Sequence, residues 1–179
     1  MQSSPAAAWR TEHEYFRRLL GLLQGQLDVF HRGERPDYDL MLDILAYLHE
    51  YGDAFHHPRE DEAFARLAKR RPDLERDLAR LKQEHRVIGR AGERLVELLN
   101  EALDGALVAR AEVEVAAATY LVYYANHIAK EEATALAAAE QALAAEDWEA
   151  VRRAVSAPAD PLFGAAPQER YRELARRLA

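Results

Sequence analysis

The segments His56-His57-Pro58-Arg59-Glu60 and His127-Ile128-Ala129-Lys130-Glu131 share the pattern His-x-x-x-Glu. Residues four apart lie on the same face of an α-helix, so each segment presents an imidazole and a carboxylate side by side. A Glu-His pair precedes each segment, Glu12-His13 before the first and Glu84-His85 before the second. The two histidines of a unit are 43 residues apart in the first unit and 42 in the second. This duplication predicts ligands for two metal ions.

The sequence around these motifs has the period of amphipathic helices almost throughout, with apolar residues every three or four positions. Long helices with short connections favour an up-down-up-down four-helix bundle, so the expected fold class is all-α. Two shorter helices, at residues 147–155 and 168–178, are expected to pack outside the bundle, with Leu162 and Phe163 as their anchor. The pattern predicts the four long helices at residues 9–30, 37–70, 72–99 and 107–143.

Pro58 lies inside the interval between His56 and Glu60. Proline removes a backbone donor, so the helix is expected to kink or break there, and ideal helical spacing does not follow. His57 with Glu60 is therefore an alternative pair. We prefer His56, because it matches the second unit residue for residue.

The side chains of the duplicated units suit a transition metal. Imidazole nitrogen is a ligand for iron, zinc or copper, whereas an all-oxygen shell would suit magnesium or calcium. Two bridging glutamates and two histidines per ion leave at least one coordination position open, as a site that binds a small ligand requires. Four imidazoles and two carboxylates buried without a cation would be costly. The predicted metal ligands are His13, His56, Glu60, His85, His127 and Glu131.

Length and composition narrow the function further. At 179 residues the chain is interpreted as one domain (1–179), with a bundle core at 9–143 and a helical extension at 144–179. The absence of cysteine excludes disulfides, thiolate zinc sites and Cys-ligated iron–sulfur clusters. A net charge of −7 argues against nucleic-acid binding. No apolar run approaches the ~20 residues that span a bilayer, and no signal peptide is recognisable, so we expect a cytoplasmic protein without a membrane partner.

Four further side chains are candidates for a supporting role around the metals. His49 lies one heptad before His56, and Tyr120 holds the equivalent place before His127. Tyr123 lies one helical turn before His127. These residues, with His57, are considered as hydrogen-bond partners of the ligands, as an extra ligand, or as a proton or electron path. The alternative is that they are ordinary amphipathic bundle residues, and we favour it.

The motifs resemble those of the hemerythrin-like family, of the cation-binding type named for its His-His-Glu motifs. The resemblance covers residues ~9 to ~143 and rests on Glu12-His13, His56 to Phe64, Glu84-His85, and His127 to Glu132. It implies a non-haem centre of two iron ions bridged by two carboxylates and an oxo or hydroxo group. Members of the family bind oxygen, sense oxygen or redox state, handle nitric oxide, or assist iron–sulfur repair.

The sequence departs from the oxygen-carrying members in its number of matching histidines. Those proteins use five, three on one iron and two on the other, whereas only four match here. A missing fifth imidazole would leave a second exchangeable position, which favours oxidation of the reduced centre over reversible oxygen binding. His49, if it reached inward, would close that position.

The preferred functional hypothesis is a di-iron protein that binds or responds to a small diatomic, oxygen or nitric oxide, in sensing, scavenging or stress defence. One alternative is iron storage, delivery or iron–sulfur repair with labile metal. A second is a structural or interaction bundle clamped by its metal. No nucleophile–base arrangement or substrate is recognisable, and no protein partner is identified. A homodimer is also allowed for.

Overall fold

The computed structural model of the chain describes residues 5–156 and 158–178. Within this part the secondary structure is helical and contains no strand. In chain order the elements are α1 (Pro5–His31), α2 (Tyr38–Tyr47), η1 (Leu48–His56), α3 (His57–Arg70), η2 (Pro72–Leu74), α4 (Glu75–Leu103), α5 (Arg110–Glu131), η3 (Glu132–Leu136), α6 (Ala137–Ala142), α7 (Ala145–Ala154), η4 (Glu169–Tyr171) and α8 (Arg172–Leu178).

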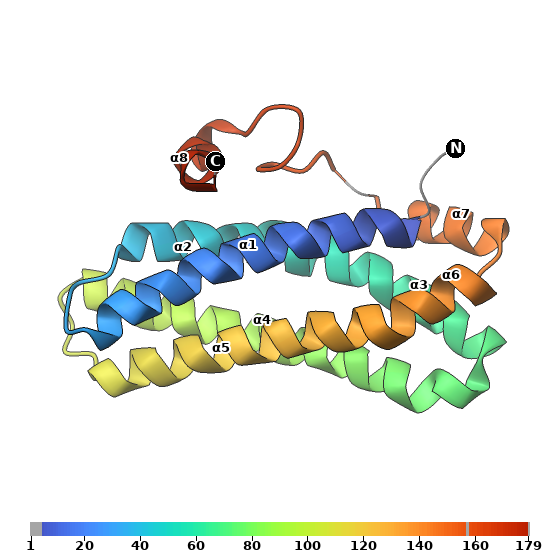
Figure 1. Cartoon of the computed structure of the whole chain (residues 1–179), viewed down its shortest axis with the longest axis horizontal. Coiled ribbons are helices and arrows are strands. Elements are labelled where there is room, and N and C mark those ends of the chain that lie inside the picture. Colours follow the sequence, from blue (N-terminus) through green and yellow to red (C-terminus); the bar gives the residue numbers. More distant parts are fainter. Residues whose placement is uncertain (1–4, 157, 179) are drawn as a thin grey trace.

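These elements form the expected four-helix bundle (Figure 1). The first rod is α1, the second is the run from α2 through η1 to α3, the third is α4, and the fourth is the run from α5 through η3 to α6. Successive rods point in opposite directions, and α5 lies between α1 and α4, which it contacts on both sides. The all-α bundle fold predicted from helical periodicity is therefore confirmed.

Two apolar clusters make up the core, one on each side of the motif residues. The larger contains Phe16, Ile44, Ile88 and Tyr124, and the smaller contains Trp9 and other residues near the opposite end of the bundle. Burial of each such side chain stabilises the fold by about 1.5–3 kcal/mol. Along α1 and α4 the sequence passes from one cluster to the other through a histidine, so the polar site divides the core. The smaller cluster includes Trp9, Phe64, Leu67, Leu81, Leu136 and Trp148.

The backbone near Pro58 departs from a regular α-helix, as expected, but the departure precedes the proline. Residues Leu48–His56 form the π-helix η1, and α3 then starts at His57. Pro58 thus occupies the first turn of α3, directly after the π-helix. A π-helix places more residues in each turn than an α-helix, so it changes which residues face the bundle axis after it. A second π-helix, η3, follows Glu131 in the fourth rod.

The C-terminal helices pack on the outside of the bundle, as predicted (Figure 1). Leu162 is buried, and the ring of Phe163 stacks on Tyr15 of α1 with centroids 4.0 Å apart. The Tyr47 hydroxyl donates a hydrogen bond to Asp160 at 2.9 Å. The extension therefore covers parts of α1, α2 and α3 and leaves the outer face of α5 exposed.

No helix in the described part of the chain is both long enough and apolar enough to cross a membrane.

Candidate metal centre

The buried polar side chains of the described chain gather in one place between the two apolar clusters. All seven belong to histidine or glutamate, and none is more than 6 % exposed. Six of them are the ligands predicted from the duplicated units, and the seventh is His57. The set consists of His13, His56, His57, Glu60, His85, His127 and Glu131.

One half of the site is formed by the first duplicated unit. His13 comes from α1 and His56 from the last residue of η1, and their Nε2 atoms lie 3.0 Å apart. The Oε1 atom of Glu60 lies 3.1 Å from Nε2 of His56 and 3.3 Å from Nε2 of His13. His56 and Glu60 therefore lie side by side, as the His-x-x-x-Glu pattern predicts, despite the π-helix and the proline.

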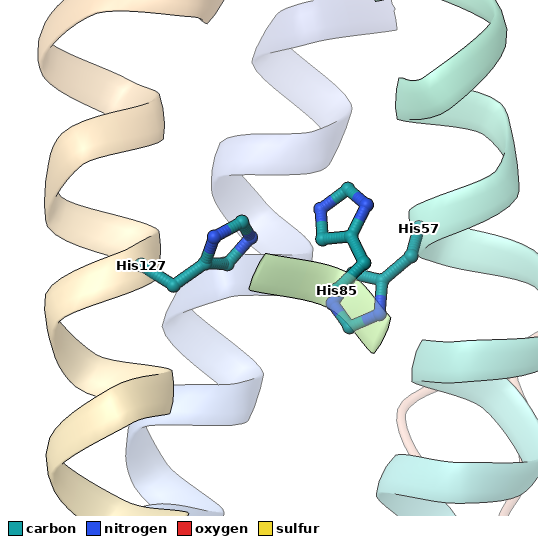
Figure 2. A group of neighbouring side chains, drawn as sticks. All are labelled: His57, His85 and His127. Carbon is teal, nitrogen blue, oxygen red and sulfur yellow. The ribbon is translucent and has the colours of Figure 1, made fainter. Parts of the chain in front are cut away.

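The other half contains three imidazoles, from α3, α4 and α5. Figure 2 shows His57, His85 and His127 turned toward one another from these three helices. The rings of His57 and His85 stack with centroids 4.2 Å apart, and the centroids of His85 and His127 are 4.6 Å apart. One ring nitrogen of each residue lies within 4.8 Å of the others, which is close enough for a shared metal ion. The structure thus places five imidazoles, not four, at the site.

Glu60 and Glu131 lie between the two halves. Glu60 directs Oε1 to His13 and His56, while its Oε2 atom lies 3.8 Å from Nε2 of His85. Glu131 directs Oε2 to His13 at 3.4 Å and to His127 at 3.3 Å, and Oε1 to His85 at 3.6 Å. Each carboxylate therefore faces both groups of imidazoles, which is the arrangement that a bridging ligand requires.

Every histidine of the site has a carboxylate at its outer ring nitrogen. Four of these contacts are hydrogen bonds, and the fifth, between His57 and Asp53, is a close contact. A proton held on Nδ1 leaves the lone pair of Nε2 directed at the centre, as in carboxylate–histidine–metal triads. The Nδ1 contacts are His13–Glu132 at 3.0 Å, His56–Glu12 at 2.5 Å, His57–Asp53 at 3.1 Å, His85–Asp61 at 3.0 Å and His127–Glu84 at 3.3 Å.

Two of these carboxylates are visible in the sequence, but the sequence pattern does not reveal their role. Glu12 and Glu84 stand directly before His13 and His85 and form part of each repeated unit. In the structure each one turns away from its neighbour in sequence and supports the later histidine of its own unit, His56 or His127. The separations from carboxylate to supported histidine, 44 and 43 residues, are the signal that could have revealed this.

The centre contains buried polar atoms that make no hydrogen bond within the described part of the chain. Both carboxylate oxygens of Glu60 and Glu131, and Nε2 of His85 and His127, have no hydrogen-bond partner among the described residues. The surrounding imidazole nitrogens are near but not in a hydrogen-bonding orientation. Buried unsatisfied groups of this kind cost about 1–3 kcal/mol each, and more when charged. Cations placed between the nitrogens and the oxygens would satisfy them all, so the residues fit a metal centre.

Burial and neighbouring charges shift the pKa values of the side chains at the site. Burial and the neighbouring charge of His85 lower the pKa of His57 to about 4, so its ring is neutral and ready to bind a metal. Burial also disfavours the charged form of His13, but Glu131 and Glu60 outweigh it and raise the pKa of His13 to about 10. The imidazoles in turn hold the pKa of Glu131 well below its usual range, although burial opposes this. In the absence of metal, protonated imidazoles therefore balance the buried carboxylates.

Two of the candidates for a supporting role are placed elsewhere. His49, which was considered as an extra ligand, does not face the interior: its side chain is 63 % exposed and contacts Asp53 at 3.3 Å. The π-helix explains this, because the heptad spacing from His49 to His56 assumes a regular α-helix. Tyr123 is 48 % exposed on the outer face of α5 and does not reach the site.

The two neighbouring tyrosines of α5 are buried instead. Tyr120 packs against Gly92 of α4, where a Cβ atom would lie 3.1 Å from the tyrosine ring. Tyr124, which the sequence pattern did not single out, has its ring 5.8 Å from that of His57, and its buried hydroxyl has no partner among the described residues. Residues 120, 124, 127 and 131 follow the inward face of α5, whereas Tyr123 lies beside that line.

A cavity connects the second half of the site to the surface. It has a volume of about 300 Å³, and its wall includes His57, His85 and Asp61. It shares Asp53 and Gly89 with a larger groove of about 580 Å³ between α2, η1 and α4. A small molecule or ion therefore has a path to this half of the centre.

Comparisons with known proteins give a match at the level of the family. No curated protein and no solved structure gives a significant match to the chain. The model of the hemerythrin HHE cation-binding domain matches residues 4–139, which is most of the bundle and includes every buried polar residue described above. With the geometry of the site, this match shows that the chain belongs to the hemerythrin HHE cation-binding domain family and is a metal-binding protein.

Proposed function

We propose that the chain holds a non-haem di-iron centre that binds or responds to a small diatomic, oxygen or nitric oxide, in sensing, scavenging or stress defence. The observation that carries the proposal is the convergence of five imidazoles on two buried, unsatisfied carboxylates. The connection of the site to the surface supports a ligand-binding role, because a purely structural clamp needs no entrance.

The ligand set divides unequally between two ions. His13 and His56 would hold one ion, and the three imidazoles of the other half would hold the second, with Glu60 and Glu131 shared between them. The ion with two imidazoles then has fewer protein ligands and more open coordination positions, whereas the cavity borders the half with three imidazoles, so a diatomic would reach the open position across that half. The fifth imidazole is His57 and not His49, so the expectation of a symmetric centre with four histidines is replaced by this unequal one.

The choice of iron rests on the chemistry of the donors. Structural zinc sites are usually tetrahedral and closed, with four ligands. Here seven side chains surround two positions, with mixed nitrogen and oxygen donors that suit a metal of higher coordination number. When bound, iron would supply reversible one-electron oxidation of each ion and a coordination position for the diatomic.

The protein's own residues control the environment of that chemistry. The carboxylates at Nδ1 fix the orientation of each imidazole, and the apolar clusters on both sides exclude water. The Tyr124 hydroxyl is a buried donor without a partner among the described residues close to His57, and it is available to a polar ligand at the centre. Gly52 leaves room for that hydroxyl, because a Cβ atom there would lie 3.1 Å from it.

The proposal is tested by iron analysis of anaerobically purified protein and by optical spectra before and after addition of oxygen or nitric oxide. Two ions per chain and a spectral change with either gas are expected. Removal of the gas under vacuum then separates reversible binding from oxidation. Stoichiometric metal with no spectral response to either gas would support the metal-clamped bundle instead.

A second candidate function, iron storage or delivery, is favoured by the charge around the entrance. Asp53, Asp61 and Glu93 line the cavity together with Arg86 and Arg90, and Glu50 and Glu97 line the adjoining groove together with Arg170, so acidic side chains outnumber basic ones. Carboxylates along an entrance attract cations. This function predicts rapid transfer of iron to a chelator in solution, whereas a sensor or scavenger should retain its iron for much longer.

A further inference from the structure

The outer face of α5 is exposed and carries few polar side chains. Residues 115–129 contain no Asp, Glu, Lys or Arg, whereas the exposed face of α4 beside it carries several charges. Val115 is 65 % exposed, Val122 58 % and Tyr123 48 %. Three of the large hydrophobic side chains exposed in the described chain thus lie on this one face.

The exposed residues of this face follow the spacing of a helix-pairing seam. They recur at steps of four and three, as the positions that meet in a coiled coil do. We call these six residues the α5 seam: Ala111, Val115, Ala118, Val122, Ala125 and Ala129.

The α5 seam is complementary to itself when a second copy runs in the opposite direction. About a twofold axis at residue 120, Ala118 meets Val122 of the second copy, and Val115 meets its Ala125. Ala111 meets Ala129 at the ends. Each valine therefore faces an alanine, which allows large and small side chains to interdigitate between closely spaced helices. A patch that meets itself across a twofold axis is the contact of a symmetric dimer.

The same axis pairs a projection with a hollow beside the seam. A groove of about 500 Å³ between α4 and α5 has Ala91, Leu98 and Val115 in its lining, together with Arg94 and Glu112, which contact each other at 4.0 Å. Tyr123 lies on the same side of α5, because Lys130, two turns further on, contacts Glu84 of α4. The twofold axis places Tyr123 opposite residues 115–117 of the second copy, at this groove.

The flank of α1 next to α5 carries small and polar side chains between Arg17, which is paired with Glu132, and His31. Arg17 contacts Glu132 and His31 approaches Glu114, so residues 17, 21, 24, 28 and 31 lie on the side of α1 nearest the fourth rod. Gly21, on that line, has nothing within 4 Å of the position of a Cβ atom. A second helix can therefore approach closely here.

The charges at both ends of the uncharged stretch are already neutralised within the chain. Arg110 pairs with Glu114 at 3.2 Å, and Lys130 pairs with Glu84 at 2.7 Å. Within the described chain, the face therefore offers no free cation to an anionic lipid or a nucleic acid. It is suited to an equally uncharged surface, and a second copy of this chain supplies one.

The surface area that such a dimer would bury is that of a small but specific protein interface. The seam is about 27 Å long at 1.5 Å per residue, and α5 with its flanks is about 20 Å wide at helix spacings of 8–10 Å. Each copy would then contribute roughly 540 Å², or about 1,100 Å² in total, at the lower end of specific protein interfaces.

We propose that the α5 seam is a homodimer interface in which two copies of the chain pair α5 against α5, antiparallel, with the axis at residue 120. The proposal is independent of the metal and of the proposed function.

The test is sedimentation of the metal-loaded full chain at micromolar to submillimolar concentrations. The wild-type chain should form a species of twice its 20.3 kDa mass. Val122→Glu and Ala118→Lys should each weaken the dimer on the order of a hundredfold, since each places an unpaired charge in the seam. The double variant should dimerise again, because the lysine introduced in each copy would then meet the glutamate introduced in the other.

Two controls keep the test decisive. Ala79→Glu places the same charge on an exposed position of α4 outside the seam and should leave the dimer unchanged. Circular dichroism and metal content must match wild type in every variant that is compared. A wild-type chain that stays monomeric at all concentrations, including one that instead binds lipid vesicles, would overturn the proposal. So would a double variant no more dimeric than its single parents.

Discussion

The two halves of the metal centre come from two repeated units, yet they differ. The first half has two imidazoles that are both fully buried, whereas the second has three and borders a cavity. The repeat alone would give two imidazoles to each half. The difference comes from His57, which belongs to the first unit by sequence but joins the second half in space. One residue next to a π-helix thus converts a nearly symmetric ligand set into an unequal one.

The strongest test of this division removes a carboxylate that both halves share. Glu131→Ala should lose both ions, because each half loses a ligand and the two positive charges lose the group that screens them. Metal analysis and optical spectra of the purified variant measure this. Glu101→Ala on the exposed face of α4 is the matched control and should keep both ions. Clean loss of one ion, with the other unperturbed, would show that Glu131 serves a single half.

Metal removal should destabilise the folded chain, because the layer that joins the two apolar clusters then keeps its buried charges without cations. Ions that bind only the folded chain stabilise it by ~4 kcal/mol at a thousandfold excess over the dissociation constant. For a chain of this size that corresponds to a melting temperature about 8–16 °C higher than in the metal-free protein. Calorimetry of loaded and chelator-treated samples checks this. Equal melting temperatures would contradict a contribution of the metal to folding.

The two halves differ in their number of imidazoles because of His57. Substitution of the exposed His49 is the matched control for substitution of His57. His57→Asn should reduce the binding affinity for one of the two ions by about tenfold or more, because it removes one of that ion's three imidazoles. The optical spectrum of the centre should also change. His49→Asn should change affinity by less than about twofold, because that side chain is exposed. Isothermal titration with ferrous ion under nitrogen gives both values. If the two variants behave alike, the fifth imidazole is not a ligand.

The smallest expected effect compares the two carboxylates that support the later histidine of each unit. Glu12 is 2.5 Å from His56 and also binds Arg59, whereas Glu84 is 3.3 Å from His127. Loss of such partners typically costs about 10–100-fold in metal affinity. Glu12→Gln should therefore reduce metal affinity by an amount near the upper end of this range, and Glu84→Gln by an amount near the lower end. Titration with ferrous ion measures both losses. The opposite order would mean that the carboxylate–histidine distance does not determine how much each carboxylate contributes to metal affinity.

Much of this architecture follows from sequence pattern. The six predicted ligands are all buried at one place, because residues on the inward faces of four helices must meet at the axis. The periodicity also predicts the outer packing of the C-terminal helices, where Leu162 is buried. These features depend on hydrophobic spacing, which a single sequence displays directly.

The features that sequence pattern missed share a physical cause. A π-helix has no simple sequence signature, so the heptad rule pointed to His49 as the inward residue and left His57 as a minor alternative. Tyr123 and Tyr124 both stand about one turn before His127, and only the rotation of α5 decides which of them is buried. The partners of the histidine Nδ1 atoms depend on side-chain contacts between helices, which spacing along one helix does not determine.

The division of the core by the site bears on how this protein opens. The cluster around Trp9 and Trp148 and the cluster around Phe16 and Ile88 meet across a layer of charged and polar groups, with little continuous apolar contact. With metal in place, that layer joins the two ends into one cooperative unit. Without metal, we expect the amide hydrogens at the two ends of the bundle to exchange at different, independent rates. Local stability follows the amount of buried apolar contact. The supply of metal would then control how readily the chain opens, so the rate of its proteolysis would report whether metal is bound.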